Sequence, residues 1–142
     1  MTGKLVTKLS NRQCFTLTEK DTLKSASENL KKHNVGVMPV LSEQNQNVVG
    51  IISERDLARH IYKDEFKNDL LVSKIMTKKI ISCSLNTSVT ELMEIISNFK
   101  TRHILIIEEK KLIGIVSIGD VVNHIIEQYK DENQQLRNFI NQ

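Results

Sequence analysis

The chain contains two copies of one sequence pattern, and this internal repeat constrains the fold more than any other feature. Residues 21–57 align with residues 87–121, and almost every apolar position and one glycine in each copy coincide. The single gap in the alignment lies in a polar turn, residues 42–47 in the first copy and 108–111 in the second. Two copies, rather than a longer array, predict one pseudo-symmetric module and not a solenoid.

Each copy predicts the element order strand, helix, strand, strand, helix. Apolar residues at helical spacing, such as Leu23, Ala26 and Leu30, indicate an amphipathic helix. Two runs rich in β-branched residues then flank a polar turn, which is typical of a hairpin. We therefore expect a mixed α/β (α+β) fold. The expected segments are 15–17, 23–30, 35–41, 48–52 and a helix from Ser53 in the first copy, and 80–82, 89–99, 104–107, 112–116 and a helix from Ser117 in the second.

Composition indicates one small globular protein. The chain has 142 residues, 39% of them hydrophobic, and a net charge of +3. No apolar run approaches the length of a membrane span or a signal peptide, so we expect a cytoplasmic protein without a membrane partner. A repeat of about sixty residues is marginally stable alone, so we expect the two halves to share a core. The helices of the repeats have two candidate N-caps each, Thr22 or Asp21 and Ser88 or Thr87.

Several classes of site find no support in the sequence. Charges of both signs are interspersed, and the chain has four Phe, two Tyr and no Trp, which argues against nucleic-acid binding. Cys14 and Cys83 lack a second Cys or a His at metal-ligand spacing, so we expect no metal and two reduced thiols, with a conditional disulfide as the alternative. No catalytic triad order and no phosphate-binding glycine loop is present, so we do not expect an enzyme.

The sharpest shared feature is a Ser-x-x-Asp sequence that follows the last predicted strand of each copy and opens a helix. It reads Ser53 to Asp56 in the first copy and Ser117 to Asp120 in the second. One copy alone favours a structural role, because this pattern is a near relative of the helix capping box. Two copies at equivalent places favour a ligand site. A helix N-terminus suits phosphate, and a carboxylate accepts hydrogen bonds from a vicinal diol such as ribose.

The duplicated hydrophobic-Gly-hydrophobic-hydrophobic-Ser-x-x-Asp signature, with Ile75-Met76-Thr77 between the copies, resembles tandem CBS-domain proteins, also called Bateman modules. The likeness is to the small stand-alone CBS-pair proteins and covers about residues 4–126. It implies two pseudo-symmetric β-α-β-β-α repeats packed sheet to sheet, with a C-terminal helical tail. We place repeat 1 at residues 1–64 and repeat 2 at residues 65–142, which include a connector at 65–79 and the C-terminal helix.

The resemblance implies a regulatory module that binds an adenosine-containing ligand in clefts between the repeats and relays this by a conformational or dimer change. AMP is the first candidate, followed by NAD(H), ADP, ATP and S-adenosylmethionine, in each case as a regulatory ligand and not a catalytic cofactor. The resemblance also implies a homodimer and an unknown protein target. By position, the implied ligand-binding residues are Thr16, Val37, Met38, Pro39, Ser53, Arg55, Asp56, Ser82, Arg102, His103, Ile104, Leu105, Ser117 and Asp120.

Several of these residues have a structural alternative. The apolar ones, such as Met38 and Ile104, are also candidates for the core. Arg55 and His103 are candidates either for phosphate contacts or for solvent-exposed positions. For the whole chain, the alternative to a sensor is an interaction scaffold that binds no ligand, since a Ser-x-x-Asp cap supports folding by itself.

The C-terminal tail carries a second pattern, with apolar residues and Asn133 separated by steps of four and three residues. This is the spacing of a coiled-coil seam. No Pro or Gly occurs in residues 121–142, so one helix could run from the second repeat to the end. The seam either folds back on its own module or forms a dimer contact with Asn133 at an a position. The seam residues are Val122, Ile126, Tyr129, Asn133, Leu136 and Ile140.

Overall fold

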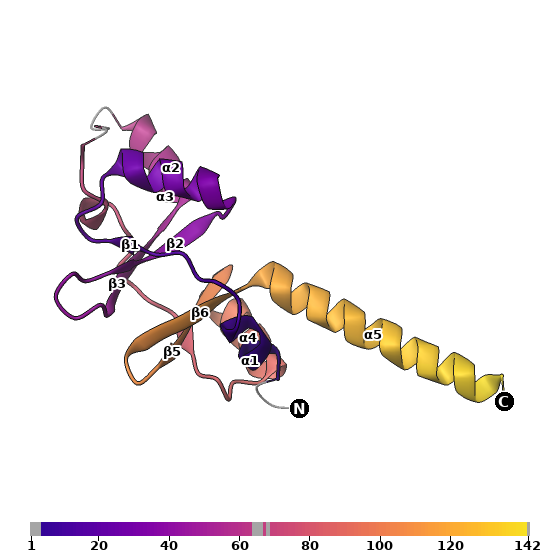
Figure 1. Cartoon of the computed structure of the whole chain (residues 1–142). Coiled ribbons are helices and arrows are strands. Elements are labelled where there is room, and N and C mark those ends of the chain that lie inside the picture. The colour runs from indigo at the N-terminus through magenta and orange to yellow at the C-terminus, as the bar shows by residue number, and fades with distance from the viewer. Residues whose placement is uncertain (1–3, 64–66, 68, 142) are drawn as a thin grey trace. The chain divides into compact units, whose positions relative to one another are not determined.

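A computed structural model describes residues 4–63, 67 and 69–141 (Figure 1). It confirms the predicted mixed α/β class, with two three-stranded sheets ordered β1-β2-β3 and β4-β5-β6. The described elements are α1 (Lys4–Ser10), β1 (Leu17–Thr18), α2 (Leu23–His33), β2 (Val37–Leu41), β3 (Val48–Ser53), α3 (Glu54–Tyr62), the short 3-10 helix η1 (Val72–Lys74), β4 (Ser82–Cys83), α4 (Val89–Phe99), β5 (His103–Glu108), β6 (Lys111–Ser117) and α5 (Ile118–Ile140).

The chain divides into two compact units, which we describe separately. The Asp56 unit consists of residues 13–80 and 108–112, and the Asp120 unit consists of residues 1–12, 81–107 and 113–142. The predicted boundary between repeats, after residue 64, lies outside the described residues and stays a prediction.

The first helix of each repeat begins where its capping residue predicts. The Thr22 hydroxyl accepts a hydrogen bond from the Ser25 amide at 3.1 Å, and the Ser88 hydroxyl accepts one from the Glu91 amide at 3.2 Å. These bonds satisfy amides that the helix itself leaves unpaired. Of the two candidate caps in each repeat, Thr22 and Ser88 are therefore the N-caps of α2 and α4.

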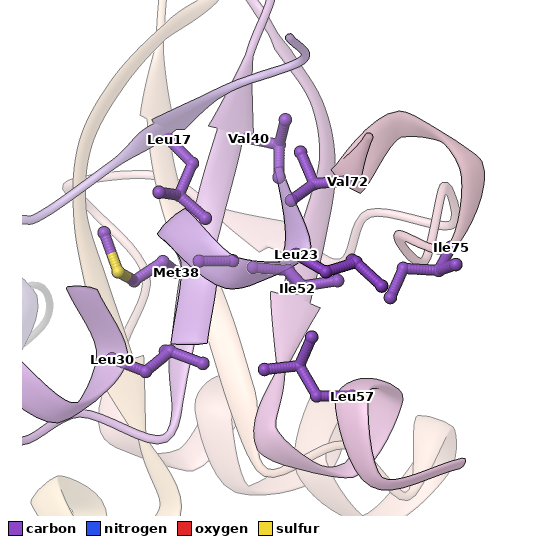
Figure 2. Packing of buried hydrophobic residues seen from close by; sticks show 10 residues of the cluster. Leu17, Leu23, Leu30, Met38, Val40, Ile52, Leu57, Val72 and Ile75 are labelled. Carbon is purple, nitrogen blue, oxygen red and sulfur yellow. The ribbon is translucent and has the colours of Figure 1, made fainter. Parts of the chain in front are cut away.

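The Asp56 unit buries one face of its sheet against α2. Strand β1 pairs with β2 in parallel, with Leu17 opposite Val40, and β2 pairs with β3 antiparallel as the predicted hairpin. Met38 and Ile52 are fully buried with the apolar face of α2. Figure 2 shows this cluster, which comprises Leu17, Leu23, Ala26, Leu30, Met38, Val40, Ile52, Leu57, Val72 and Ile75.

Each unit has its own apolar cluster, and whether the two units also share a core stays a prediction. The connector supplies Val72 and Ile75 to the cluster of the Asp56 unit. In the same way, the N-terminal segment before β1 forms α1, which the periodicity did not predict, and α1 contributes to the Asp120 unit. That cluster comprises Leu5, Val6, Leu9, Cys83, Leu92, Ile104, Ile106, Val116 and Val121. The sheet of each unit therefore gains apolar area from the segment that leads into the first strand of the other unit's sheet.

Gly50 permits the close approach of this borrowed segment in the Asp56 unit. Ile51 exchanges two backbone hydrogen bonds of 2.9 Å with Thr77. A methyl group at Gly50 would lie 2.7 Å from the Met76 Sδ atom and 2.9 Å from the Thr77 carbonyl oxygen. The second of these contacts is with backbone and cannot be relieved by a change of side-chain rotamer.

We expect Gly50→Ala to destabilise the protein by about 1–3 kcal/mol, because the added methyl forces the connector away from β3. Gly36→Ala is the matched control, since its methyl would find only Glu54 Oε2, at 3.9 Å. Chemical denaturation monitored by circular dichroism measures both variants. Equal stability of the two variants would show that the connector does not pack as described.

Candidate functional site

The two Ser-x-x-Asp sequences form complete capping boxes, one in each unit. The Ser53 amide donates to Asp56 Oδ2 at 2.9 Å, and the Asp56 amide donates to the Ser53 hydroxyl at 3.2 Å. At the start of α5 the Ser117 amide donates to Asp120 Oδ2 at 2.8 Å, and the Asp120 amide donates back to the Ser117 hydroxyl at 3.1 Å. Sequence thus predicted these helix starts correctly, and each cap fixes one carboxylate at a helix N-terminus.

One oxygen of the Asp56 carboxylate accepts short hydrogen bonds, and the other accepts only a long one. Its Oδ2 atom also accepts a hydrogen bond of 2.9 Å from the Ser53 hydroxyl. Its Oδ1 atom accepts a long hydrogen bond of 3.4 Å from the Thr77 hydroxyl. A bond at this distance is weak, so Oδ1 keeps capacity to accept a stronger donor. Asp56 is half-buried, so a ligand can reach it.

In contrast, both oxygens of the Asp120 carboxylate are engaged by Arg12. The Arg12 guanidinium donates to Oδ1 at 2.9 Å and to Oδ2 at 2.6 Å, which is a bidentate pair. It also donates to the Ile115 carbonyl oxygen of β6 at 2.8 Å. The side chain of Asp120 is 17% exposed and that of Arg12 is 44% exposed. Arg12 therefore holds the acid of this unit against its own sheet.

The same contacts set the charge of Asp120. Partial burial by itself would raise the pKa of the Asp120 carboxyl. Hydrogen bonds from Arg12 and from the Ser117 backbone outweigh burial and hold this pKa below its ordinary value of 3.8. Asp120 is thus ionised at neutral pH and presents a carboxylate to its surroundings.

Sequence reasoning missed both Arg12 and Thr77 as neighbours of the two acids. A signal was available, because residue 21 aligns with residue 87, an offset of 66, and at that offset Asn11 and Arg12 correspond to Thr77 and Lys78. The segments are pseudo-equivalent, and each meets the acid of the unit to which it lends its apolar residues. What differs is the contacting group, a neutral hydroxyl in one unit and a guanidinium in the other.

The predicted strand residues separate into two faces. Met38 and Ile104 belong to the apolar clusters of their units and are core residues. Val37, Pro39 and Leu105 alternate with them along the strands, so they lie on the opposite face of each sheet. They are nevertheless buried and belong to neither cluster. The resemblance expects the adenine ring beside all five of these strand residues, and Val37, Pro39 and Leu105 are the ones that lie outside the core clusters.

The predicted basic residues lie near the helix starts. The Arg102 carbonyl oxygen accepts a hydrogen bond of 2.9 Å from the Ile118 amide, which places exposed Arg102 beside the N-terminus of α5. Arg55, in the first turn of α3, is also exposed. Burial lowers the pKa of the His103 imidazole below 6.5; the Asp120 carboxylate opposes this shift and Arg102 adds to it. His103 is therefore mostly neutral at neutral pH.

The two predicted extended segments carry their polar residues at the surface. Thr16 is exposed and follows Phe15, whose ring stacks on His33 with centroids 3.6 Å apart. Ser82 is exposed and pairs with Leu105, in register with the parallel bridge of β4 and β5. Ser82 therefore lies in the edge strand β4, and Thr16 directly precedes the edge strand β1.

Beside Asp120 lies a small pocket of about 120 Å³, lined by Leu5, Lys8, Leu9, Asn123, His124 and Glu127 as well as by Asp120.

The part of the chain that the structure describes contains no group of three or more His, Cys, Asp or Glu side chains placed to hold a metal ion. Within the same residues, no helix has the length and apolar character needed to cross a bilayer.

Comparison with known proteins agrees with this geometry. The CBS domain family matches residues 6–63 and 72–127, which is most of the chain and both repeats. The chain therefore belongs to the CBS-domain family, as a tandem pair.

Individual relatives support the same assignment. A mitochondrial CBS domain-containing protein of Arabidopsis thaliana is 35% identical over 127 residues, which are 87% of this chain but only 62% of that protein. The crystal structure of a CBS-domain containing protein from Agrobacterium tumefaciens superposes with a TM-score of 0.77 at 31% identity, over 86% of this chain and 96% of that one. A CBS domain pair crystallised with 5′-methylthioadenosine and S-adenosyl-L-methionine shares the fold, with a TM-score of 0.77 at 21% identity over 88% and 98% of the two chains.

We expect Arg12→Ala to lower the free energy of unfolding at neutral pH by about 1 kcal/mol, since water screens the half-exposed guanidinium. The pKa of Asp120 is lower in the folded than in the unfolded state. This stabilisation is therefore present above the unfolded pKa and is lost as the pH falls through the folded pKa. Denaturant unfolding at several pH values should show the difference between wild type and variant shrinking on acidification.

The control is Lys20→Ala, which removes the solvent-exposed pair between Lys20 and Glu43 at 2.9 Å. Exposed pairs contribute little, so this variant should unfold much like the wild type. The assigned contact would be contradicted if Arg12→Ala lowered the free energy of unfolding at neutral pH no more than Lys20→Ala does. It would also be contradicted if the effect of Arg12→Ala did not change with pH.

Proposed function

We propose that this CBS pair is a regulatory, non-catalytic sensor of the cytoplasm that binds an adenosine-containing ligand. The observation that supports the proposal is the pair of carboxylates, Asp56 and Asp120, each held at a helix N-terminus by a capping box. A carboxylate can accept hydrogen bonds from both hydroxyls of a ribose, and the adjacent helix N-terminus favours the binding of a phosphate. Each unit thus supplies a half-site for one nucleoside.

AMP is the first ligand that we propose, followed by NAD(H), ADP, ATP and S-adenosylmethionine. The CBS pair crystallised with 5′-methylthioadenosine and S-adenosyl-L-methionine supports the adenosine class, since both of its ligands contain adenosine. The buried second face of the strands, with Val37, Pro39 and Leu105, would take the adenine ring. Exposed Arg55 and Arg102 beside the helix starts would attract a phosphate and thereby favour AMP over adenosine.

We further propose that the two half-sites are not equivalent. A ribose can use Asp56 Oδ1 at the cost of one long hydrogen bond from Thr77. At Asp120 a ribose must compete with the bidentate Arg12 contact. Binding there would release Arg12 from both Asp120 and the Ile115 carbonyl oxygen, and so loosen the segment that follows α1. Such a release is a route by which occupancy becomes a conformational or dimer change that a protein target detects.

Calorimetric titration with AMP tests the function. We expect Asp56→Ala to weaken binding about tenfold or more, because a hydrogen bond to a charged group is lost. Asp120→Ala should weaken binding less, and Arg12→Ala should strengthen binding by freeing the second acid. Asp131→Ala, an exposed acid on the outer part of α5, is the control for the loss of one negative charge and should bind like the wild type.

This experiment distinguishes failure of the sensor proposal from failure of the proposal that the half-sites are not equivalent. No heat of binding from the wild type with any of the proposed nucleotides would reject the sensor. Binding that is weakened equally by Asp56→Ala and Asp120→Ala would keep the sensor and reject the inequality of the half-sites.

A ligand-free interaction scaffold is the second candidate, and one observation favours it. Both capping boxes are complete without a ligand, so the repeated Ser-x-x-Asp sequence already has a structural role. Thermal unfolding with a nucleotide panel separates the two functions. A ligand that binds only the folded state raises its stability by RT ln(1 + [L]/Kd), whereas a scaffold shows no shift.

A further inference from the structure

The outer part of α5 carries an apolar stripe that the described chain leaves exposed. Helix α5 is continuous from Ile118 to Ile140, and Figure 1 shows it as one helix running to the C-terminal end. Val121 is the one buried residue of this helix. The apolar stripe, by contrast, has side chains that are 46–70% exposed, namely Val122, Ile126, Tyr129, Leu136 and Ile140. The seam predicted from sequence is thus not covered by a fold-back onto its own unit.

The spacing of this stripe is that of a coiled-coil heptad. Ile126, Asn133 and Ile140 take a positions, and Val122, Tyr129 and Leu136 take d positions. The b, c and f positions from residue 127 to residue 138 are all polar, namely Glu127, Gln128, Asp131, Gln134, Gln135 and Asn138. An apolar seam with an entirely polar back is suited to one partner helix of the same kind.

We propose that the seam is covered by the α5 helix of a second copy of this chain, parallel and in register. This inference does not depend on the proposed ligand. Asn133 is the first reason. In a parallel in-register pair, Asn133 meets the partner's Asn133, and each side-chain amide donates to and accepts from the other. A shift by one heptad would place Asn133 against the partner's Ile126 or the partner's Ile140 and leave a buried polar group without a bond.

Charge at the flanking positions is the second reason. Glu132 takes a g position and Arg137 takes the following e position. In a parallel pair each g residue faces the next e residue of the other helix, so Glu132 pairs with the partner's Arg137 twice across the dimer. An antiparallel pair would instead bring e positions together, where Lys130 and Arg137 carry the same charge, and would set Asn133 against an apolar d residue. Both features select the parallel arrangement.

Disulfide trapping in the full chain tests the orientation. The background carries Cys14→Ser and Cys83→Ala, with thermal unfolding used to confirm that it remains folded. We expect Asn133→Cys to form a covalent dimer readily on mild oxidation, because facing a positions bring the two Cα atoms within disulfide range. Asp131→Cys is the matched control, since an f position points away from the partner and should cross-link slowly.

Sedimentation equilibrium of the full chain tests the charge pair in solution. Arg137→Glu should weaken the dimer about tenfold, because two attractive pairs become repulsive. Adding Glu132→Arg to the same chain exchanges the two charges and should restore most of the affinity. Asp131→Arg changes charge to a similar extent at an outward position and should leave the dimer constant unchanged.

Three results would overturn the proposal. One is a wild type that remains monomeric at tens of micromolar, an order-of-magnitude concentration for a specific interface. Another is cross-linking at Asp131→Cys that equals cross-linking at Asn133→Cys, which would indicate random collision or a different seam. The third is a charge exchange that fails to rescue Arg137→Glu, which would show that Glu132 and Arg137 do not face each other in the dimer.

Discussion

The capping box at each helix start is the interaction on which both the fold and the candidate site depend. One carboxylate closes the N-terminus of the helix and is also the acid of the half-site. The backbone amide of the N-cap serine fixes that carboxylate at the helix start, and Arg12 holds the Asp120 carboxylate in addition. Loss of Asp56 would therefore change stability as well as binding. For this reason each variant in the calorimetric titration must first be shown to be folded by circular dichroism.

The exchange of preceding segments explains how two short repeats acquire complete cores and different sites. Helix α1 leads into β1 but packs in the Asp120 unit, and the connector with Val72 leads into β4 but packs in the Asp56 unit. Each exchanged segment also brings one side chain to the acid of its host unit. Arg12 makes a charged bidentate contact and Thr77 makes a long neutral one, so a symmetric backbone carries two chemically distinct environments.

Local sequence was sufficient for the elements whose signals are local. Thr22 and Ser88 were correctly among the candidate caps, and the hairpins and the helix starts at Ser53 and Ser117 agree with the structure. Helix α1 is short and its role is set by long-range packing, so periodicity did not reveal it. The contact of Arg12 with Asp120 spans 108 residues and has no local signature. The strands at Met38 and Ile104 are buried on both faces, and such runs show no alternation from which the core side could be read.

The central claim is that the capped carboxylates receive a ribose. The most direct test is a calorimetric comparison of AMP with its 2′-deoxy and 3′-deoxy analogues on the wild-type chain. Each analogue removes one donor to the carboxylate and leaves adenine and phosphate unchanged. We expect each to bind about tenfold more weakly than AMP, the loss that corresponds to one hydrogen bond to a charged acceptor. Equal affinity for AMP and both analogues would contradict the account, because it would place the ribose away from Asp56 and Asp120.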